Sequence, residues 1–305
     1  MSFRQLFILK DVYMSIDSNR VAIKQEEHIN YVPVEDIAII IIDSKKCTFS
    51  STFFSLCASK SIPILICGDT HHPVSLSLPI NSHYRPYHVL SLQITMKDDT
   101  KEKLTEILLK SKLSNQKRVL ELTERSEESI SMMDNYINEI VNKDDINREG
   151  TAAKVFFNQM YGNDFVRFED DPINSKLNYG YNVFAACISR YLSVCGINIA
   201  LGVNHCGKTN PYNLVYDLIE PFRPIVDYYI FDSMKYTTDI LNVQTKKELV
   251  NLLNVKVVVK NKTVTVQYAM EMIAKSYLRV LEGGPIELDI PLIQEINFNK
   301  LNESV

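Results

Sequence analysis

The spacing of apolar residues changes once along this chain, and the change divides the sequence into two kinds of structure. Between Leu6 and Cys67 the apolar residues come in short, closely spaced groups, as in β-strands. The run Ile37–Ile42 is apolar on both faces, which predicts a central strand. After about residue 90 the spacing becomes three or four residues, the period of helices. We therefore predict an α+β protein in which a small N-terminal β-rich domain precedes a larger all-α domain.

Length and turn residues predict where these domains begin and end. The chain has 305 residues, enough for about two domains of ordinary size. A stretch rich in proline and histidine, from Pro79 to Pro86, follows the last predicted strand. We assign residues 1–78 to the β-rich domain, 79–90 to a linker and 91–305 to the helical domain. In the first domain, Ser50 or Ser51 is expected to cap a short helix.

Composition excludes several classes of protein. With 46% apolar residues, 23% charged residues and a net charge of -4, the chain has an ordinary globular profile, unlike a histone-like nucleic-acid binder. Nine glycines and no GxGxxG disfavour a dinucleotide-binding fold. The six cysteines contain no CxxC pair, so we expect neither a disulfide framework nor structural zinc. With no signal peptide and no long apolar run, we expect a cytosolic protein without a membrane partner.

A carboxylate stands on the apolar face of one predicted helix. This helix is expected to begin at Asp144 or Asp145, either of which is a good N-cap, and to run to Met160. Counting back by three and four places Glu149 on the face formed by Ala152, Ala153, Phe156 and Met160. A carboxylate in the interior must be paired, protonated or metal-bound. The alternative is a solvent-facing Glu in the first turn, which the helix dipole favours.

Two further carboxylates lie on a helix that we expect to start at the Asn-Pro pair of residues 210 and 211. Asp217 and Glu220 are three residues apart and share a face, where two anions repel unless a cation lies near them. Prolines at positions 221 and 224 then remove backbone hydrogen bonds and predict a kink or a stop. We interpret this segment as a candidate ion site. The alternative is a surface helix in which Arg223 pairs with Asp227.

The loop before that helix, Gly202–Thr209, matches the phosphate-loop pattern GxxxxGK[ST] in full. A phosphate loop follows a strand and leads into a helix that starts at its lysine, here Lys208. In this chain only residues 197–201 offer a strand, and a predicted helix from about Asn174 to Val194 precedes them. This context disfavours nucleotide binding, but a phosphate-loop protein remains an alternative.

His205, in the same loop, is a candidate metal ligand. If the loop packs beside the helix of Asp217 and Glu220, one imidazole joins two carboxylates. This oxygen-dominated set suits Mn²⁺ or Mg²⁺ better than structural zinc. The other five histidines lie in the first domain or the linker, and we assign them no metal role.

Basic residues gather on the first long helix of the helical domain. They form a phosphate-facing stripe in one interpretation and a solvated helix face in the other. The helix of Glu149 adds further positive charge. The candidate DNA contacts are Lys101, Lys110, Lys117, Arg118, Arg148 and Lys154.

Four blocks of residues stand out within the helical domain. They are Glu149-Gly150 with Ala152, Ala153, Phe156 and Phe157; Asn174 with Leu177–Tyr181; His205; and Asp217–Pro224 with Asp227. In order and spacing, these blocks resemble the CRISPR-associated integrase, the universal endonuclease subunit of CRISPR adaptation, and most closely its type II forms. The resemblance covers nearly the whole chain. It implies that Glu149, His205 and Glu220 bind Mg²⁺ or Mn²⁺, supported by Asp217. Many members have Asp as the last ligand, and Glu220 follows the type II pattern instead.

The same resemblance implies a function in antiviral defence. Such a protein inserts short foreign DNA fragments, called spacers, into a CRISPR repeat array, and it also acts as an endonuclease. A DNA 3′-hydroxyl attacks the phosphodiester, which the metal polarises. The implied partners are double-stranded DNA (prespacer and repeat array), a second copy of the chain bound through the β-rich domain, and a small adaptation protein that bridges two such homodimers into a heterohexamer.

Three classes of function stay open on the sequence. A metal-dependent integrase loses strand transfer when Glu149, His205 or Glu220 is replaced by Ala. A phosphate-loop ATPase is instead inactivated by Lys208→Ala and stabilised by ATP. A non-catalytic DNA-binding scaffold responds only to substitutions on its basic face.

Overall fold

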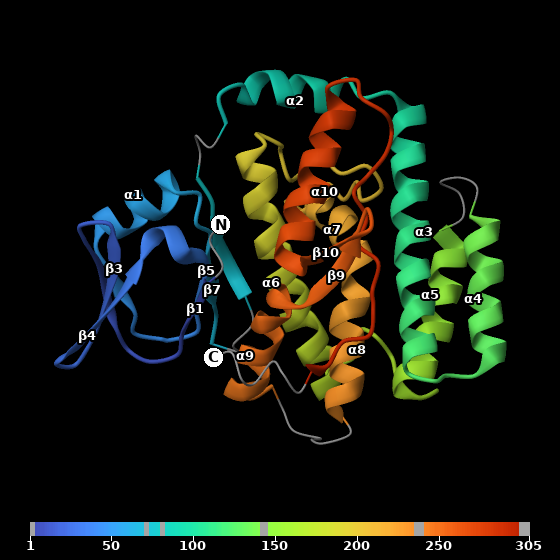
Figure 1. The fold of residues 1–305 in the computed structure, drawn as a ribbon, viewed down its shortest axis with the longest axis horizontal. Helices are drawn as coiled ribbons and strands as arrows, with labels where there is room; N and C mark the ends of the chain where they lie inside the picture. Colours follow the sequence, from blue (N-terminus) through green and yellow to red (C-terminus); the bar gives the residue numbers. More distant parts are fainter. Residues whose placement is uncertain (1–3, 70–72, 80–82, 141–145, 235–240, 299–305) are drawn as a thin grey trace.

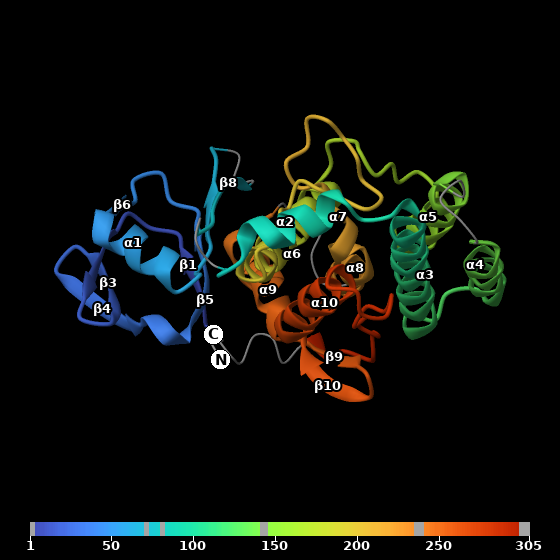
Figure 2. The ribbon, with the colours of Figure 1, turned by 90° about the horizontal axis from the view of Figure 1, so that it is seen from above.

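The structure is a computed structural model that describes residues 4–69, 73–79, 83–140, 146–234 and 241–298. A strand-rich part at the N-terminus lies beside a larger helical part that begins at Pro86 (Figure 1). The view from above shows the same two parts side by side, with the strand-rich part on the left (Figure 2). This architecture confirms the predicted α+β class, a β-rich region followed by a helical one.

The strand-rich part contains two four-stranded sheets. In the first sheet three strands run parallel and the last is antiparallel; the order is β1 (Arg4–Ile8), β5 (Ile37–Ile42), β7 (Ile64–Cys67) and β8 (Pro73–Ser77). In the second sheet the order is β4 (His28–Pro33), β3 (Arg20–Gln25), β2 (Tyr13–Asp17) and β6 (Thr48–Phe49). The connections include a 3₁₀ turn, η1 (Val34–Asp36), and one helix, α1 (Ser51–Ser59). The side chain of Ser50 caps α1, as predicted, by accepting a hydrogen bond from the backbone N–H of Phe53.

Strand β5 is covered on both faces, which explains its sequence of six apolar residues. It lies between the parallel strands β1 and β7, and every one of its residues is buried. Ile40 and Ile42 pack into the core between the first sheet, the second sheet and α1. Ile39 and Ile41 point the other way and belong to the core of the helical part. The prediction of a central strand is therefore confirmed.

The helical part is built around α6, which contacts α7, α8, α9 and α10. A Cβ atom on Gly180 of α6 would lie 2.5 Å from Cγ1 of Val226, so α6 and α8 pack closely at that glycine. The elements are α2 (Pro86–Ile94), α3 (Asp98–Leu122), α4 (Glu127–Glu139), α5 (Ile146–Tyr161), α6 (Pro172–Val194), α7 (Asn213–Ile219), η3 (Glu220–Phe222), α8 (Arg223–Met234), α9 (Val243–Asn251), η4 (Leu252–Asn254) and α10 (Val266–Leu281).

A β-hairpin inside the helical part was not predicted. Its strands are β9 (Lys256–Val259) and β10 (Lys262–Thr265), and they pair antiparallel. Lys260 and Asn261 form the turn, and both have positive φ. The buried side chains of β9 join the core of the helical part. Four residues per strand are too few for apolar spacing to distinguish a strand from a helix.

Other boundaries differ from the predictions or lie outside the described residues. Helix α7 begins at Asn213, later than the predicted cap at Asn210. The Asn210 side chain instead accepts a hydrogen bond from the backbone N–H of Tyr212, a local turn that delays the helix. The predicted caps of α5, Asp144 and Asp145, lie outside the described residues. The predicted linker, 79–90, overlaps α2 from Pro86 onward.

The two parts of the chain are joined by buried or partly buried polar contacts as well as by β5. Lys246 Nζ of α9 lies 2.6 Å from Oδ2 of Asp43, at the end of β5. Arg190 Nη1 of α6 donates to the carbonyl oxygen of Ala38 over 2.7 Å. The strand-rich part is thus anchored directly to the helical part. Among the described residues, none of the helices is both long enough and apolar enough to cross a membrane.

Candidate metal centre

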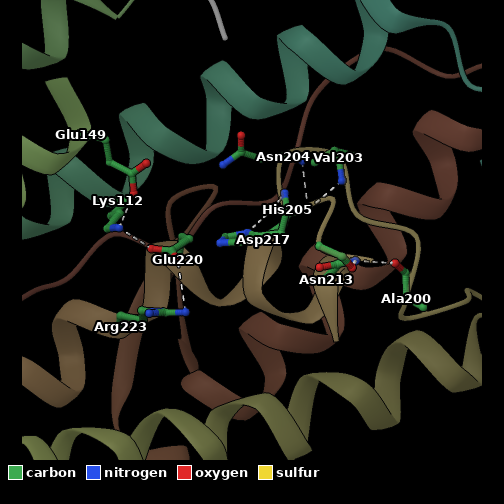
Figure 3. A network of polar contacts seen from close by, with 11 residues as sticks. Lys112, Glu149, Ala200, Val203, Asn204, His205, Asn213, Asp217, Glu220 and Arg223 are labelled. Carbon is green, nitrogen blue, oxygen red and sulfur yellow. Dashed lines mark hydrogen bonds and ion pairs between the residues drawn. The ribbon is translucent and has the colours of Figure 1, made fainter. Parts of the chain in front are cut away.

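Two carboxylates from different helices meet at the ammonium group of a lysine (Figure 3). Glu149 lies in the first turn of α5, and Glu220 begins η3. The Nζ atom of Lys112, on α3, is 2.6 Å from Glu149 Oε1 and 2.7 Å from Glu220 Oε2. The side chain of Glu149 is 21% exposed and that of Glu220 is 7% exposed. Glu149 is therefore turned toward the protein interior, as the apolar face of its helix indicates.

Glu220 stands where the helix is interrupted. Helix α7 ends one residue before it, and α8 starts at Arg223, because two prolines remove backbone donors here. Asn115 of α3 donates from Nδ2 to the carbonyl oxygen of Pro221 over 2.7 Å, which satisfies one acceptor at the interruption. Arg223 Nη2 lies 3.2 Å from Glu220 Oε1. Arg223 thus forms its ion pair with Glu220, whereas the alternative interpretation paired it with Asp227.

A buried carboxylate on α7 holds the loop that carries His205. Asp217 Oδ2 accepts hydrogen bonds from the backbone N–H of Val203 at 2.7 Å and of Asn204 at 3.2 Å. Its Oδ1 accepts the backbone N–H of His205 at 3.0 Å and lies 2.6 Å from the ring Nδ1. This hydrogen bond to Asp217 raises the pKa of His205, although burial lowers it. Because Nδ1 is engaged, Nε2 is the ring nitrogen that can bind a metal.

Burial and neighbouring charges have opposite effects on the pKa values of Glu220 and Lys112. Burial alone would raise the pKa of Glu220, but Arg223 and Lys112 lower it below its ordinary value. Burial alone would lower the pKa of Lys112, but Glu220 and Glu149 raise it. Glu220 and Lys112 therefore carry full charges at neutral pH.

The phosphate-loop alternative lacks the structure it needs. Residues 197–201 form no strand, and the next helix begins at Asn213, well after the exposed Lys208. A Cβ atom on Gly202 would lie 2.2 Å from the carbonyl oxygen of His205 and 2.8 Å from Asp217 Oδ2. The first glycine of the pattern is thus required by packing inside the loop, without any phosphate.

The three predicted metal ligands fall into two neighbouring groups. Glu149 and Glu220 share Lys112, while His205 is bonded to Asp217, one helical turn before Glu220. As they stand, no three His, Cys, Asp or Glu side chains in the described ranges are close enough to hold a metal ion. The donor set nevertheless fits a hard divalent cation. Two carboxylates converge on one positive charge, and a third carboxylate orients the imidazole, as is usual for metal-bound histidines.

The predicted DNA contacts do not form a single stripe. By the helical period, Lys110 and Lys117 share a face of α3, and Lys101 lies on the opposite face. Lys154 is exposed on α5, and the side chain of Arg148 lies outside the described residues. The four predicted contacts that lie on α3 have carboxylate partners: Lys101 with Asp98, Lys110 with Glu106, Lys117 with Asp134, and Arg118 with Glu121.

Sequence reasoning missed Lys112 and Asn115 as parts of this centre. Lys112 was considered only as one of the basic residues of its helix that could form a phosphate-facing stripe, and Asn115 was not considered. A signal was present, because Lys112 follows Leu108 and Leu109 by four and three residues and so lies on the buried face of α3. A lysine on such a face requires a nearby anion.

The fold and the site define a class: a two-part α+β protein whose helical part carries a centre of carboxylates and one imidazole. Residues 6–252 match the family model described as CRISPR associated protein Cas1. Because this match spans most of the chain, the chain belongs to the CRISPR-associated Cas1 family. The resemblance found in the sequence is thereby confirmed.

Individual relatives extend over nearly the whole chain. It is 27% identical over 297 residues to the CRISPR-associated endonuclease Cas1 of Neisseria meningitidis serogroup C (strain 8013), covering 96% of this chain and 97% of the relative. A solved structure of a casposase bound to integration product has a TM-score of 0.73 and 20% identity, covering 94% of this chain and 93% of that one. A chain of a Cas6-RT-Cas1–Cas2 complex has a TM-score of 0.73 and 14% identity, covering 96% of this chain and 36% of that one. These two structures share the fold.

Proposed function

We propose that this protein is a divalent-metal-dependent DNA endonuclease and integrase of CRISPR adaptation, in which Glu149, His205 and Glu220 bind Mg²⁺ or Mn²⁺. Family membership and the similarity to a Cas1 endonuclease along the whole chain support the activity. The observation that carries the metal site is the convergence of Glu149 and Glu220 on one positive charge, next to an imidazole held by Asp217.

Each residue of the centre has a separate task in this proposal. Glu149 and Glu220 provide anionic oxygens from α5 and η3, and His205 provides Nε2 from the loop. Asp217 keeps the imidazole in place through Nδ1 and holds the loop through backbone N–H groups. A cation bound there supplies Lewis-acid polarisation of a phosphodiester. The nucleophile is the 3′-hydroxyl of the DNA fragment, so the side chains position the reacting groups and donate none of the atoms that are joined.

The substrates and partners follow from the family. We propose that the protein inserts short foreign DNA into a repeat array, and that prespacer and array are both double-stranded DNA. A homodimer formed through residues 1–78 and a small adaptation protein would assemble as a heterohexamer in the prokaryotic cytoplasm. The similarity to a chain of a Cas6-RT-Cas1–Cas2 complex supports a partner of that kind. Lys101, Lys110, Lys117, Arg118, Arg148 and Lys154 remain predicted DNA contacts.

Strand transfer tests this proposal. A labelled short duplex with free 3′-hydroxyl ends is incubated with a repeat-bearing plasmid, the small partner protein and Mn²⁺ or EDTA. We expect joining with Mn²⁺, none with EDTA, and a loss of at least about 100-fold in His205→Ala, because one of three ligands is removed. His88→Ala is the matched control, since His88 is exposed on α2.

The outcomes separate the three classes of function. Joining that survives His205→Ala would refute the assignment of the metal ligands. Damage by Lys208→Ala together with stabilisation by ATP would favour the phosphate-loop alternative. DNA binding without joining under any condition, weakened only by substitutions of basic residues, would favour a non-catalytic scaffold.

A further inference from the structure

Lys112 occupies the space between the two carboxylates of the candidate metal centre. Its Nζ atom lies 2.6 Å from Glu149 Oε1 and 2.7 Å from Glu220 Oε2, and its side chain is only 12% exposed. No other lysine or arginine of the described residues forms ion pairs with both carboxylates; Arg223 pairs with Glu220 alone. The ammonium group is therefore the charge that allows Glu149 and Glu220 to lie close together (Figure 3).

The same contacts conflict with metal binding. The ammonium group of Lys112 donates a hydrogen bond to Glu149 Oε1, which engages a lone pair of that oxygen, and it forms an ion pair with Glu220 Oε2. A divalent cation between Glu149 and Glu220 would require the oxygens that now contact Lys112. It would also bring a second positive charge against the ammonium in a site with little water. Lys112 and a cation therefore cannot both hold these oxygens in the observed arrangement.

We propose that Lys112 is a positioning residue that keeps Glu149 and Glu220 together until a divalent cation replaces its ammonium group. This inference rests on the proposed function only in that the two carboxylates bind metal. Loading of the centre is then an exchange of one cation for another. Lys112 lowers the apparent affinity for metal, and it preserves the fold of the metal-free protein by compensating two partly or fully buried anions.

If the metal replaces the ammonium group, substitution of Lys112 should change the affinity for metal in the opposite direction to substitution of a lysine that only supports the site. Removing a residue that merely supports the site would weaken metal binding. Removing a competitor for the ligand oxygens would strengthen it. We therefore expect Lys112→Met to bind Mn²⁺ about tenfold more tightly than the wild type. In EDTA the same variant should melt at a lower temperature than the wild type, and Mn²⁺ should raise its melting temperature more.

The experiment is a titration of the purified full chain with Mn²⁺, with free Mn²⁺ measured by electron paramagnetic resonance. Lys110→Met is the matched control, because Lys110 lies on the same helix and pairs with Glu106, outside the centre. It should bind Mn²⁺ like the wild type. Lys112→Arg keeps a positive charge between the carboxylates and should bind Mn²⁺ more weakly than Lys112→Met does.

A second measurement needs no substitution. Lys112 of the wild type is labelled briefly with an amine-reactive reagent in Mn²⁺ or EDTA, and its peptide is quantified by mass spectrometry against that of Lys110. Displacement by the metal should make Lys112 several-fold more reactive. Unchanged reactivity in saturating Mn²⁺ would overturn the proposal, even if Lys112→Met failed to fold.

The results also separate this inference from the proposed function. Equal Mn²⁺ affinity of wild type and Lys112→Met, or weaker binding by the variant, would overturn the exchange and leave the metal centre standing. Binding that appears only in Lys112→Met would support the exchange strongly. Absence of Mn²⁺ binding in every variant would overturn the metal centre itself, and the exchange with it.

Discussion

Replacing Asp217 by Asn tests whether one buried carboxylate holds the loop that carries His205. The two oxygens of Asp217 receive the backbone N–H groups of Val203, Asn204 and His205 and face the imidazole Nδ1. An amide has one oxygen and one NH₂ group. With the imidazole proton on Nδ1, either orientation of the side chain would place the NH₂ group against two of these four donors.

The structure gives the size of the effect. A hydrogen bond to a charged group contributes about 1.5–3 kcal/mol, and the Asp217 side chain is fully buried, so solvent does not weaken these bonds. Losing two of them should destabilise the closed loop by about 3–6 kcal/mol. That corresponds to an increase of about 100-fold or more in the opening equilibrium of residues 203–205.

Hydrogen exchange measured by mass spectrometry in EDTA reads this opening directly. The peptide that contains residues 203–205 should exchange at least about 100-fold faster in Asp217→Asn than in the wild type. Asp134→Asn is the control. Asp134 forms a partly exposed ion pair with Lys117, and such a pair contributes less than about 1 kcal/mol. Loop protection in Asp217→Asn equal to that of the control would refute the role of Asp217.

Three further predictions concern packing, pH and the contact between the two parts. Gly202→Ala should lower strand transfer at least about tenfold, because the added Cβ would meet the carbonyl oxygen of His205. Gly207→Ala is the control and should keep its activity, because a Cβ there would lie 3.5 Å from its nearest neighbour. Equal activities of the two variants would refute the packing argument. Burial raises the pKa of Asp227 to about 7, above its unfolded value, so the free energy of unfolding should fall by up to about 4 kcal/mol as pH rises from 4 to 7. In urea unfolding from pH 4 to 7, the free energy of unfolding of Asp227→Asn should depend less on pH than that of the wild type. An identical dependence on pH in both proteins would contradict the prediction. Lys246→Met should cost about 3–5 kcal/mol in urea unfolding, since Asp43 stays buried without that ammonium, and adding Asp43→Asn should recover part of the loss.

The sequence predicted the features that depend on long or strongly biased patterns. The six consecutive apolar residues of β5, five of them β-branched Ile, predicted a strand covered on both faces. Prolines 221 and 224 predicted the interruption at Glu220–Phe222, because the missing N–H groups act locally. The helical period predicted Glu149 on the apolar face of its helix, and the structure favours this over the solvent-facing alternative.

Features that depend on distant partners could not be predicted in the same way. Lys112 and Glu220 are far apart in the sequence, and only the packing of α3 against η3 brings them together. The predicted start of α7 was wrong because the Asn210 side chain forms a local turn with Tyr212. The sequence pattern of such a turn is the same as that of a helix cap. The hairpin of β9 and β10 was missed because its strands are short.

The shared strand β5 limits how this protein can be divided or recombined. Its alternate residues belong to different cores, so the core of the helical part includes side chains that the strand-rich part provides. A fragment that begins at α2 would lack Ile39, Ile41 and Leu65 and leave an apolar surface on its helices uncovered. Exchange of the N-terminal part with that of a relative would succeed only if the incoming strand matched the helices it must cover. The helical part therefore depends on the strand-rich part for its core, although the sequence pattern divides the chain into two.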